Sequence, residues 1–431
     1  MATTDRVQGP TWWPTKGTPA RQEYVGPDAC GQCHRAKVNS ARNSPMAHAS
    51  MAVADSEILR SHDRLETQIG PYHYEIVRTP EGSAYSASDG AKSVSVPLAW
   101  AFGIGEVGQT YVYEQDGKWY ESHLSYYKNI QGLDYSPGHQ RTVPSSLGSA
   151  LGRLFEIGEP RLCFGCHSTA STTSNQFDPS HLISGVTCEA CHGPGAQHVE
   201  KMSLGVENQK SKTIFNPRTL KPVDSVEFCG ACHRTAWDVA LAGSKGIFNL
   251  RFQPYRLETS RCWGQGDARL VCTACHDPHE PLVRDLASYD QRCLACHTTT
   301  PASKSMPTPD HPGAACRVST KDCVTCHMPK QEIPGMHATF TDHRIRVVHK
   351  DDTITESVSP NFPARPRGER NGLFFAFCLV AGPGVDRALL VQVKSAVLQG
   401  GGHNPFAELK RVMDAHRHPT SEGEPQRISG K

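Results

Sequence analysis

The segment Cys188-Glu189-Ala190-Cys191-His192, followed by Gly193-Pro194-Gly195, contains two cysteines three positions apart and a histidine directly after the second. Two thiols at this spacing can each add to a vinyl group of one haem, and the next histidine then reaches the iron from the same side. The segment therefore predicts a covalently attached c-type haem and a chain that folds around it.

The same Cys-x-x-Cys-His pattern occurs six more times. Together the copies supply the cysteines Cys30, Cys33, Cys163, Cys166, Cys188, Cys191, Cys229, Cys232, Cys272, Cys275, Cys293, Cys296, Cys323 and Cys326. The histidines that follow them are His34, His167, His192, His233, His276, His297 and His327. Zinc ribbons and thioredoxin-like dithiol pairs also use Cys-x-x-Cys, but neither needs a histidine at the next position. Every copy has one, although only 22 of 431 residues are histidine, so we predict seven haems c with these cysteines as attachment points and these histidines as proximal iron ligands.

The composition fits a chain with many loops that is built around such groups. Hydrophobic residues make up 37% of the sequence, and there are 37 glycines and 31 prolines. Porphyrins would add apolar surface to the core, so we expect the protein without haem to be largely unfolded. The net charge of +2 indicates neither nucleic acid nor an acidic substrate as a partner. Many lysines and arginines are available to pair with haem propionates.

The location of the protein has to be argued from its chemistry. Haem attachment to such motifs takes place outside the bacterial cytoplasmic membrane, yet residues 1–24 contain no apolar run of signal-peptide length. No stretch reaches the ~18 apolar residues of a membrane span. We expect a periplasmic or otherwise extracytoplasmic protein with no membrane span in this chain, although no signal peptide is visible.

The predicted fold is mainly α-helical with long loops, and it includes a small antiparallel β insertion near the N-terminus. The expected segments are a flexible N-terminal segment (1–23), a first haem segment (24–64), a β-rich insertion (65–132), a six-haem core (133–349) and a C-terminal extension with two short helices and a disordered tail (350–431). Alternation from Tyr72 to Val77 and the Asp116-Gly117 turn predict the strands. Residues 103–108 match G-x-G-x-x-G, but a strand pattern follows where a dinucleotide site needs a helix.

A c-type haem iron can take a second ligand on the face opposite its proximal histidine. His48 is one candidate; Met46 is its rival and would raise the reduction potential, and a surface histidine is the alternative. His139 precedes the second motif and is another candidate, with a loop histidine as the alternative. His123, in a predicted strand, is a weaker one.

Several segments in order resemble one family. They are Tyr24-Val25-Gly26, residues 163–169 (CFGCHST), 185–198 (GVTCEACHGPGAQH), 228–233 (FCGACH), 272–279 (CTACHDPH), 323–329 (CVTCHMP) and Asp342-His343-Arg344-Ile345. This series is similar to the multihaem cytochromes of the group that contains the tetrahaem cytochrome of ammonia oxidisers and hydroxylamine oxidoreductase, and most similar to bacterial relatives often fused to tetratricopeptide repeats. The resemblance covers residues 24–349. Beyond residue 350 we find no period of ~34 residues, so such repeats are not predicted here.

The resemblance implies a multihaem cytochrome c fold with histidine on both faces of most irons and haems in stacked and perpendicular pairs. It indicates His198 and His279 as distal ligands, because they match histidines that follow the family's CHGPG and CHDP segments. His279 lies three residues after His276, which already occupies one face of its own haem, so it should reach a neighbouring iron. The same holds for His198 and His192. His311 and His343 are further candidates, and His337 is a weaker one.

Three cysteines lie outside the haem motifs: Cys262, Cys316 and Cys378. An exported protein could pair two of them, and Cys262 with Cys316 is the most plausible pair because both lie within the haem region. Inert buried thiols are the equal alternative.

The expected function is electron transfer between redox partner proteins, either other cytochromes or a quinol-oxidising complex. The rival hypothesis is a multihaem oxidoreductase acting on a small nitrogen or sulfur compound, of the hydroxylamine or nitrite type, at one open haem. No Cys-x-x-Cys-Lys motif of the nitrite reductase kind is present, and the cross-linking tyrosine of hydroxylamine oxidoreductase matches no motif here. Seven haems nevertheless need seven distal ligands, so one five-coordinate iron is compatible with the sequence. No catalytic residue is assigned.

Overall fold

A computed structural model describes residues 21–348 except 157, 174–175, 181, 206–212, 236–238, 240–245, 264–266, 298–315 and 317. His311 and Cys378 lie outside the described residues. So do the C-terminal extension 350–431 and residues 1–20 of the expected N-terminal segment.

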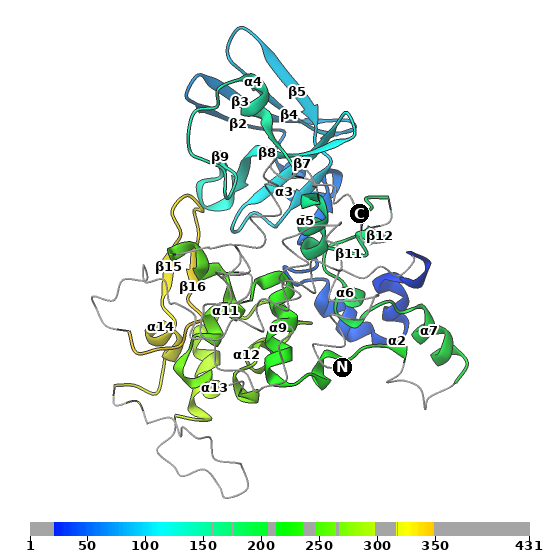
Figure 1. Cartoon of the computed structure of the whole chain (residues 1–431), viewed down its shortest axis with the longest axis vertical. Helices are drawn as coiled ribbons and strands as arrows, with labels where there is room; N and C mark the ends of the chain where they lie inside the picture. The colour runs from blue at the N-terminus through cyan, green and yellow to red at the C-terminus, as the bar shows by residue number, and fades with distance from the viewer. Residues whose placement is uncertain are drawn as a thin grey trace, which may run out of the picture.

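Two antiparallel sheets form the upper part of the molecule (Figure 1). The first contains β1 (Ser50–Ala52), β6 (Trp100–Phe102), β7 (Gln109–Gln115), β8 (Lys118–Tyr127) and β10 (Gly152–Leu154) in that order, with β9 (Gly132–Tyr135) also paired to β8. The second contains β2 (Arg64–Ile69), β3 (Tyr72–Thr79), β4 (Gly82–Ser88) and β5 (Ser93–Pro97). The prediction of a mainly α-helical fold with a small β insertion was therefore wrong, because strands extend beyond the expected range 65–132 at both ends.

Alternation of side chains explains the second sheet. In β3, Tyr72, Tyr74 and Ile76 are buried while the residues between them are half-buried, which is the period-two pattern of a sheet with one face on the core. Asp116 and Gly117 join β7 to β8 with φ angles of 52° and 69°. Positive φ at both positions is the requirement of a type I′ hairpin, which Asp-Gly meets readily. Residues 103–108 connect β6 to β7 and open no helix.

The core of these sheets is rich in tyrosine. Tyr74, Tyr85, Tyr111 and Tyr113 are fully buried or nearly so, and they belong to one cluster with aliphatic residues of both sheets. We call residues 50–154 the β module. It has a hydrophobic core that is made entirely of its own side chains.

The rest of the described chain consists of short helices and loops. The helices α2 (Gly26–Ala41), α5 (Glu159–His167), α6 (Cys188–His192), α9 (Pro222–His233), α12 (Cys272–Cys275), α13 (Asp290–Leu294) and α14 (Cys323–His327) each carry part or all of one haem motif. Among the described residues, α7 (Ala196–Ser203) and α11 (Gln253–Glu258) carry no motif, and α3 (Glu57–Ser61) and α4 (Leu147–Leu151) lie within the β module. Short hairpins pair β11 (Ser168–Thr169) with β14 (Ile183–Ser184), β12 (Thr172–Thr173) with β13 (Gln176–Phe177) and β15 (Lys330–Glu332) with β16 (Thr339–Thr341).

The motif-bearing helices have little hydrophobic core of their own. Among the described residues, their buried apolar side chains form small separate clusters, such as Phe228 with Ala231 and Val226 with Leu257 and Trp263. Clusters of this size cannot offset the conformational entropy that the loops lose on folding. The cohesion of this part has to come from the groups that the motifs bind.

This division predicts an uneven loss of structure in protein that is produced without haem attachment. The β module is expected to keep its strands because its core is complete, whereas the helices are expected to unfold. Limited proteolysis with far-ultraviolet circular dichroism would measure this. The expected result is a protected fragment within residues 50–154, and cleavage that is equally fast in both parts would contradict the prediction.

Candidate haem-binding cavity

One continuous cavity of about 5230 Å³ runs through the helical part of the protein. An ordinary small-molecule site occupies ~300–1,000 Å³, so this cavity is large enough for several cofactors. Residues from all seven Cys-x-x-Cys-His motifs line it, including every one of the seven proximal histidines. The cavity therefore brings together motifs that are as far apart in the sequence as His34 and His327.

Three of the proximal histidines are oriented by a backbone carbonyl. Nδ1 of His167 donates to Ala49 O over 3.0 Å, Nδ1 of His192 to Phe215 O over 2.8 Å, and Nδ1 of His327 to Arg346 O over 2.8 Å. A hydrogen bond at Nδ1 fixes the tautomer and leaves Nε2 free to bind a metal. The protein thus holds these rings in the orientation that an axial iron ligand needs.

Burial favours the neutral form of five of the histidines that line the cavity. It is the largest cause that lowers the pKa of His192, His198, His233 and His276, and it lowers the pKa of His343 to about 4. A neutral imidazole is the form that binds a metal. The donor set, two thiols and an imidazole per motif around an apolar space, fits covalently attached haem.

Three further histidines line the cavity within the described part of the chain: His198, His279 and His343. Their Nδ1 atoms lie 3.3 Å from Thr213 Oγ1, 3.0 Å from Asp277 Oδ1 and 3.0 Å from Thr341 O, respectively. Each therefore keeps Nε2 available, as the proximal histidines do.

Two of these histidines face a proximal histidine at the spacing of axial ligands. A metal–imidazole bond is about 2.0 Å long and the ring centroid lies roughly 1.1 Å behind the nitrogen, so two rings on one metal have centroids about 6.2 Å apart. The ring centroids of His192 and His279 are 6.1 Å apart, and those of His276 and His343 are 6.3 Å apart. The gap within each pair matches one metal ion.

His343 is held in place by a buried ion pair next to it. Arg256 binds both oxygens of Asp342, with Nε to Oδ1 at 2.8 Å and Nη2 to Oδ2 at 2.7 Å, and the two side chains are 5% and 0% exposed. Nη1 of Arg346 also donates to Asp342 Oδ2. This arrangement explains the Asp-His-Arg segment at 342–344, because the carboxylate anchors the backbone that presents His343.

The predicted ligands His48 and His139 do not line the cavity. Nε2 of His48 donates to Arg42 O over 2.8 Å. His139 lies in the β module, where its ring nitrogens contact His123 Nδ1 at 3.3 Å and Glu121 Oε2 at 3.1 Å. Met46, the rival of His48, does line the cavity. In this arrangement neither histidine offers Nε2 to a haem.

The weaker candidates His123 and His337 also lie outside the cavity lining. Burial lowers the pKa of His123 to about 4, and its ring packs against Tyr74 and Tyr135 in the core of the β module. Nε2 of His337 lies 2.6 Å from Asp134 Oδ2. His123 thus packs within the β module, and His337 joins the β15–β16 hairpin to that module.

Contacts between cysteines show which motifs are neighbours. The thiols of Cys30 and Cys188 lie close enough to interact, as do those of Cys229 and Cys272 and those of Cys293 and Cys323. The first motif thus adjoins the third, the fourth adjoins the fifth, and the sixth adjoins the seventh. Cys166 Sγ contacts Ala231 O at 3.7 Å, which places the second motif beside the fourth. Figure 1 shows α2 beside α6, although they are more than 140 residues apart.

The second motif is attached to the β module. Phe164 of α5 is fully buried and packs edge-to-face against Trp100 and Phe102 of β6. Arg153 donates to both carboxylate oxygens of Glu159, at 2.9 and 2.7 Å. Aromatic packing and a bidentate ion pair fix the start of this motif on the sheet.

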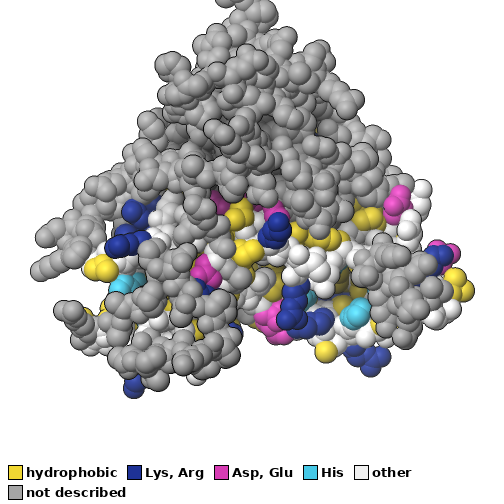
Figure 2. All heavy atoms as spheres, turned by 60° about the horizontal axis from the view of Figure 1, so that its bottom comes forward, with side chains coloured by type: hydrophobic (Ala, Val, Ile, Leu, Met, Phe, Trp, Pro, Cys, Tyr) yellow, Lys and Arg dark blue, Asp and Glu magenta, His cyan; other side chains and the backbone are white. Residues whose placement is uncertain are grey.

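Basic side chains accompany the histidines of the cavity. Arg42, Arg251, Arg269 and Lys37 are among the residues that line it. The underside of the molecule shows histidines beside lysine and arginine side chains (Figure 2). Lys37, Arg42 and Arg269 already pair with Asp277, Asp28 and Asp267, so haem propionates would compete with these carboxylates.

The predicted Cys262–Cys316 disulfide is not formed, and the described cysteines make no disulfide. Both residues line the cavity, and burial raises the pKa of Cys262. Of the two alternatives, thiols are what the structure contains.

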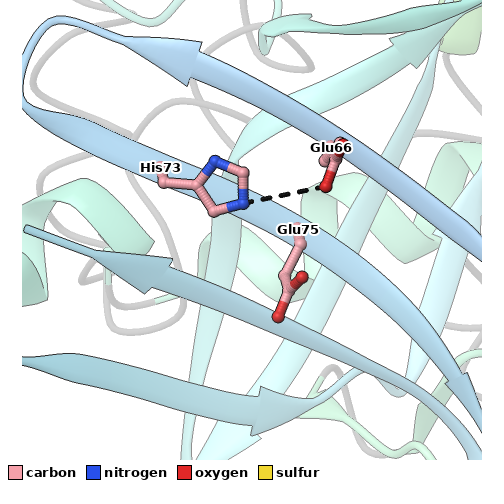
Figure 3. Close-up of side chains that lie close together, drawn as sticks. All are labelled: Glu66, His73 and Glu75. Atoms are coloured by element: carbon pink, nitrogen blue, oxygen red, sulfur yellow. Dashed lines mark ion pairs between the residues drawn. The ribbon is translucent and has the colours of Figure 1, made fainter. Parts of the chain in front are cut away.

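A second group of potential metal ligands lies on the exposed face of the β module. Glu66 of β2 and His73 and Glu75 of β3 bring their ligand atoms within 4.8 Å of one another (Figure 3). Arg64 pairs with both carboxylates, through Nε to Glu66 Oε2 at 3.0 Å and Nη2 to Glu75 Oε2 at 2.5 Å. The guanidinium already supplies the positive charge that two facing carboxylates need, so we interpret the group as an ion-pair cluster.

The family model for "cytochrome c554 and c-prime" matches residues 118–193, which contain the second and third motifs. This match and the seven Cys-x-x-Cys-His motifs make the chain similar to multihaem c-type cytochromes. The multihaem cytochrome MtrA of Shewanella baltica (strain OS185) is 23% identical over 218 residues, which cover 47% of this chain and 55% of that protein. The chain thus spans about half the length of this curated relative.

The crystal structure of the outer cell wall cytochrome OcwA is similar to this chain with a TM-score of 0.43 and 14% identity, over 76% of this chain and 80% of that one. In the part of the chain that the structure describes, no helix is long and apolar enough to cross a membrane.

Proposed function

We propose that this cytochrome relays electrons through seven haems c, most of them with histidine on both faces of the iron. The observation that carries the proposal is that all seven proximal histidines line one continuous cavity. Haem c supplies one-electron chemistry when it is bound. The chain's contribution is to hold the seven attachment sites next to one another.

We assign three distal ligands from the geometry. His279 completes the iron held by His192, and His343 completes the iron held by His276, since the ring spacings of 6.1 and 6.3 Å suit one metal. His198 is assigned to the iron held by His34, since both histidines line the same cavity. Each distal ligand thus comes from a segment other than that of the motif it completes.

The contacts between motifs support a branched order in space. One branch joins the first motif to the third, and the third to the fifth through His192 and His279. The other joins the second motif to the fourth, the fourth to the fifth, the fifth to the sixth and the sixth to the seventh. The first, second and seventh motifs are the ends, and we propose that redox partner proteins exchange electrons there.

Two broader assignments belong to this proposal. Membership of the group that contains hydroxylamine oxidoreductase and the tetrahaem cytochrome of ammonia oxidisers is supported by the order of motifs. A position outside the cytoplasmic membrane is supported by the site of haem attachment in bacteria. The partners expected there are other cytochromes or a quinol-oxidising complex.

A second candidate function follows from the count of distal ligands. Among the described residues, three histidines beyond the proximal seven line the cavity. An iron without a distal side chain would be open to a small nitrogen or sulfur compound, and the protein would then be an oxidoreductase. The proximity of the motifs to one another still favours the relay.

The optical and paramagnetic resonance spectra of the fully oxidised holoprotein separate the two functions. A relay predicts signals from low-spin, six-coordinate iron. A substantial high-spin signal that shifts when hydroxylamine or nitrite is added would support catalysis and contradict the relay.

A further inference from the structure

Glu189 lies inside the third haem motif, between its two cysteines, and is only 1% exposed. Its carboxylate accepts three backbone hydrogen bonds. Val25 N and Gly195 N donate to Oε1 over 2.9 and 2.8 Å, and Gly26 N donates to Oε2 over 2.8 Å. Because both oxygens accept from N–H groups, the bonds match an ionised carboxylate.

Two of these donors belong to the start of α2, the helix of the first motif. Val25 is the N-cap residue of α2 and makes no side-chain capping bond. The first N–H groups of a helix need acceptors from outside the helix. Glu189, more than 160 residues away in the sequence, supplies them and so ties the first motif to the third.

A carboxylate also caps a helix of a neighbouring motif at another pair of motifs. Asp290 opens α13, three residues before Cys293 of the sixth motif, and is 7% exposed. Its Oδ2 accepts from Asp322 N over 2.8 Å and its Oδ1 from Cys323 N over 2.9 Å. Asp322 is the N-cap residue of α14 and makes no side-chain capping bond either.

The two carboxylates act where cysteines of two motifs touch. Cys30 contacts Cys188 in the pair tied by Glu189, and Cys293 contacts Cys323 in the pair tied by Asp290. Each carboxylate comes from one motif helix and caps the helix of the motif paired with it, so a shift of one helix moves the other with it.

We propose that Glu189 and Asp290 are positioning residues that fix the separation of haems within two haem pairs, the first with the third and the sixth with the seventh. This inference rests on the proposed relay, whose rate depends on that separation. The buried negative charge also favours the oxidised state of the haems beside it. The two residues would thereby set both the distance and the potential within each pair.

The test uses the mature holoprotein with Glu189→Gln and Asp290→Asn, which keep the size of each side chain and remove its charge. Glu114→Gln on the exposed part of β7 is the matched control. The mass and the low-spin spectrum are measured first, because missing haems in the unmodified protein would contradict the proposed function and not this inference. The pair separation is then read from the magnetic coupling between oxidised irons, and the potentials are read from a spectroelectrochemical titration.

Each of the two variants is expected to change the coupling of its own haem pair and to leave the other pair unchanged. The redox equilibrium of that pair should shift about tenfold towards the reduced state, or about 59 mV for one electron. The Glu114→Gln protein should match the unmodified protein. Coupling and potentials that are unchanged in both variants would overturn the inference.

If the Glu189→Gln protein does not mature with its haems attached, a milder variant tests the same contact. A Cβ atom at Gly195 would lie 3.2 Å from Glu189 Oε1 and 3.1 Å from Val25 Cγ2. Gly195→Ala should therefore displace the carboxylate slightly and weaken the coupling of the first pair, with the sixth and seventh motifs unaffected. An unchanged first pair in a fully loaded Gly195→Ala protein would also overturn the inference.

Discussion

Replacing His279 with alanine is expected to convert one haem from low-spin to high-spin while every covalent attachment remains. His279 lies opposite His192 with a ring-centroid separation of 6.1 Å, and its Nδ1 is held by Asp277, so Nε2 is the nitrogen that is left to bind an iron. Alanine leaves that face without a ligand. The loss of one strong axial ligand changes the spin state of the iron.

The measurement is the paramagnetic resonance spectrum of oxidised His279→Ala protein, with the haem content checked by mass. His139→Gln is the matched control, because His139 contacts Glu121 and His123 in the β module and lies outside the cavity lining. Its spectrum should equal that of the unmodified protein. A high-spin signal in His139→Gln and none in His279→Ala would reverse the assignment of the distal ligand.

Replacing Asp342 with asparagine should cause the largest loss of stability. The change leaves the guanidinium of Arg256, only 5% exposed, without its charged partner. Removal of one partner from a buried ion pair costs about 3–5 kcal/mol, because the remaining charge stays buried and uncompensated. His343 also loses the anchor of its backbone, so the iron held by His276 should lose its distal ligand in part of the molecules.

Chemical denaturation of the holoprotein would measure the loss in the free energy of unfolding. Glu106→Gln is the control, since Glu106 pairs with Arg284 at the surface and exposed pairs contribute about 0–1 kcal/mol. Equal losses in the two variants would show that the Arg256–Asp342 pair has no special role.

Acid should weaken the same ion pair. Burial alone would raise the pKa of Asp342, but the hydrogen bonds and charge of Arg256 outweigh it and hold the pKa below the usual 3.8. A carboxyl group whose pKa is lowered by folding contributes its full stabilisation above its unfolded value. The contribution is lost as the pH falls below 3.8 and through the lower pKa of the folded protein, and the Asp342→Asn protein should lack this part of the acid dependence.

The haem chemistry could be predicted from the sequence because it depends on local spacing. Cys-x-x-Cys-His places two thiols and an imidazole on one turn of chain, and no distant residue is needed to recognise it. The strands of the β module with clear alternation, such as β3, were predictable for the same reason. The strand that the sequence indicates after the glycine-rich segment at 103–108 is β7.

The remaining features depend on distant contacts. Strands β1 and β10 have three residues each and pair with β6 and β8, so neither shows an alternation long enough to detect. Local sequence could not show that the backbone carbonyl of Arg42 accepts from His48, or that the carboxylate of Glu121 contacts His139. It also gave no sign that Glu189, a variable position of its motif, caps a helix formed by residues 26–41.

The mass and iron content of the mature holoprotein test the central claim most directly. The account predicts that the intact chain exceeds its polypeptide mass by seven covalently bound haems, with seven irons and no zinc. A mature protein that carries no haem, or that holds zinc at its Cys-x-x-Cys-His motifs, would contradict the account.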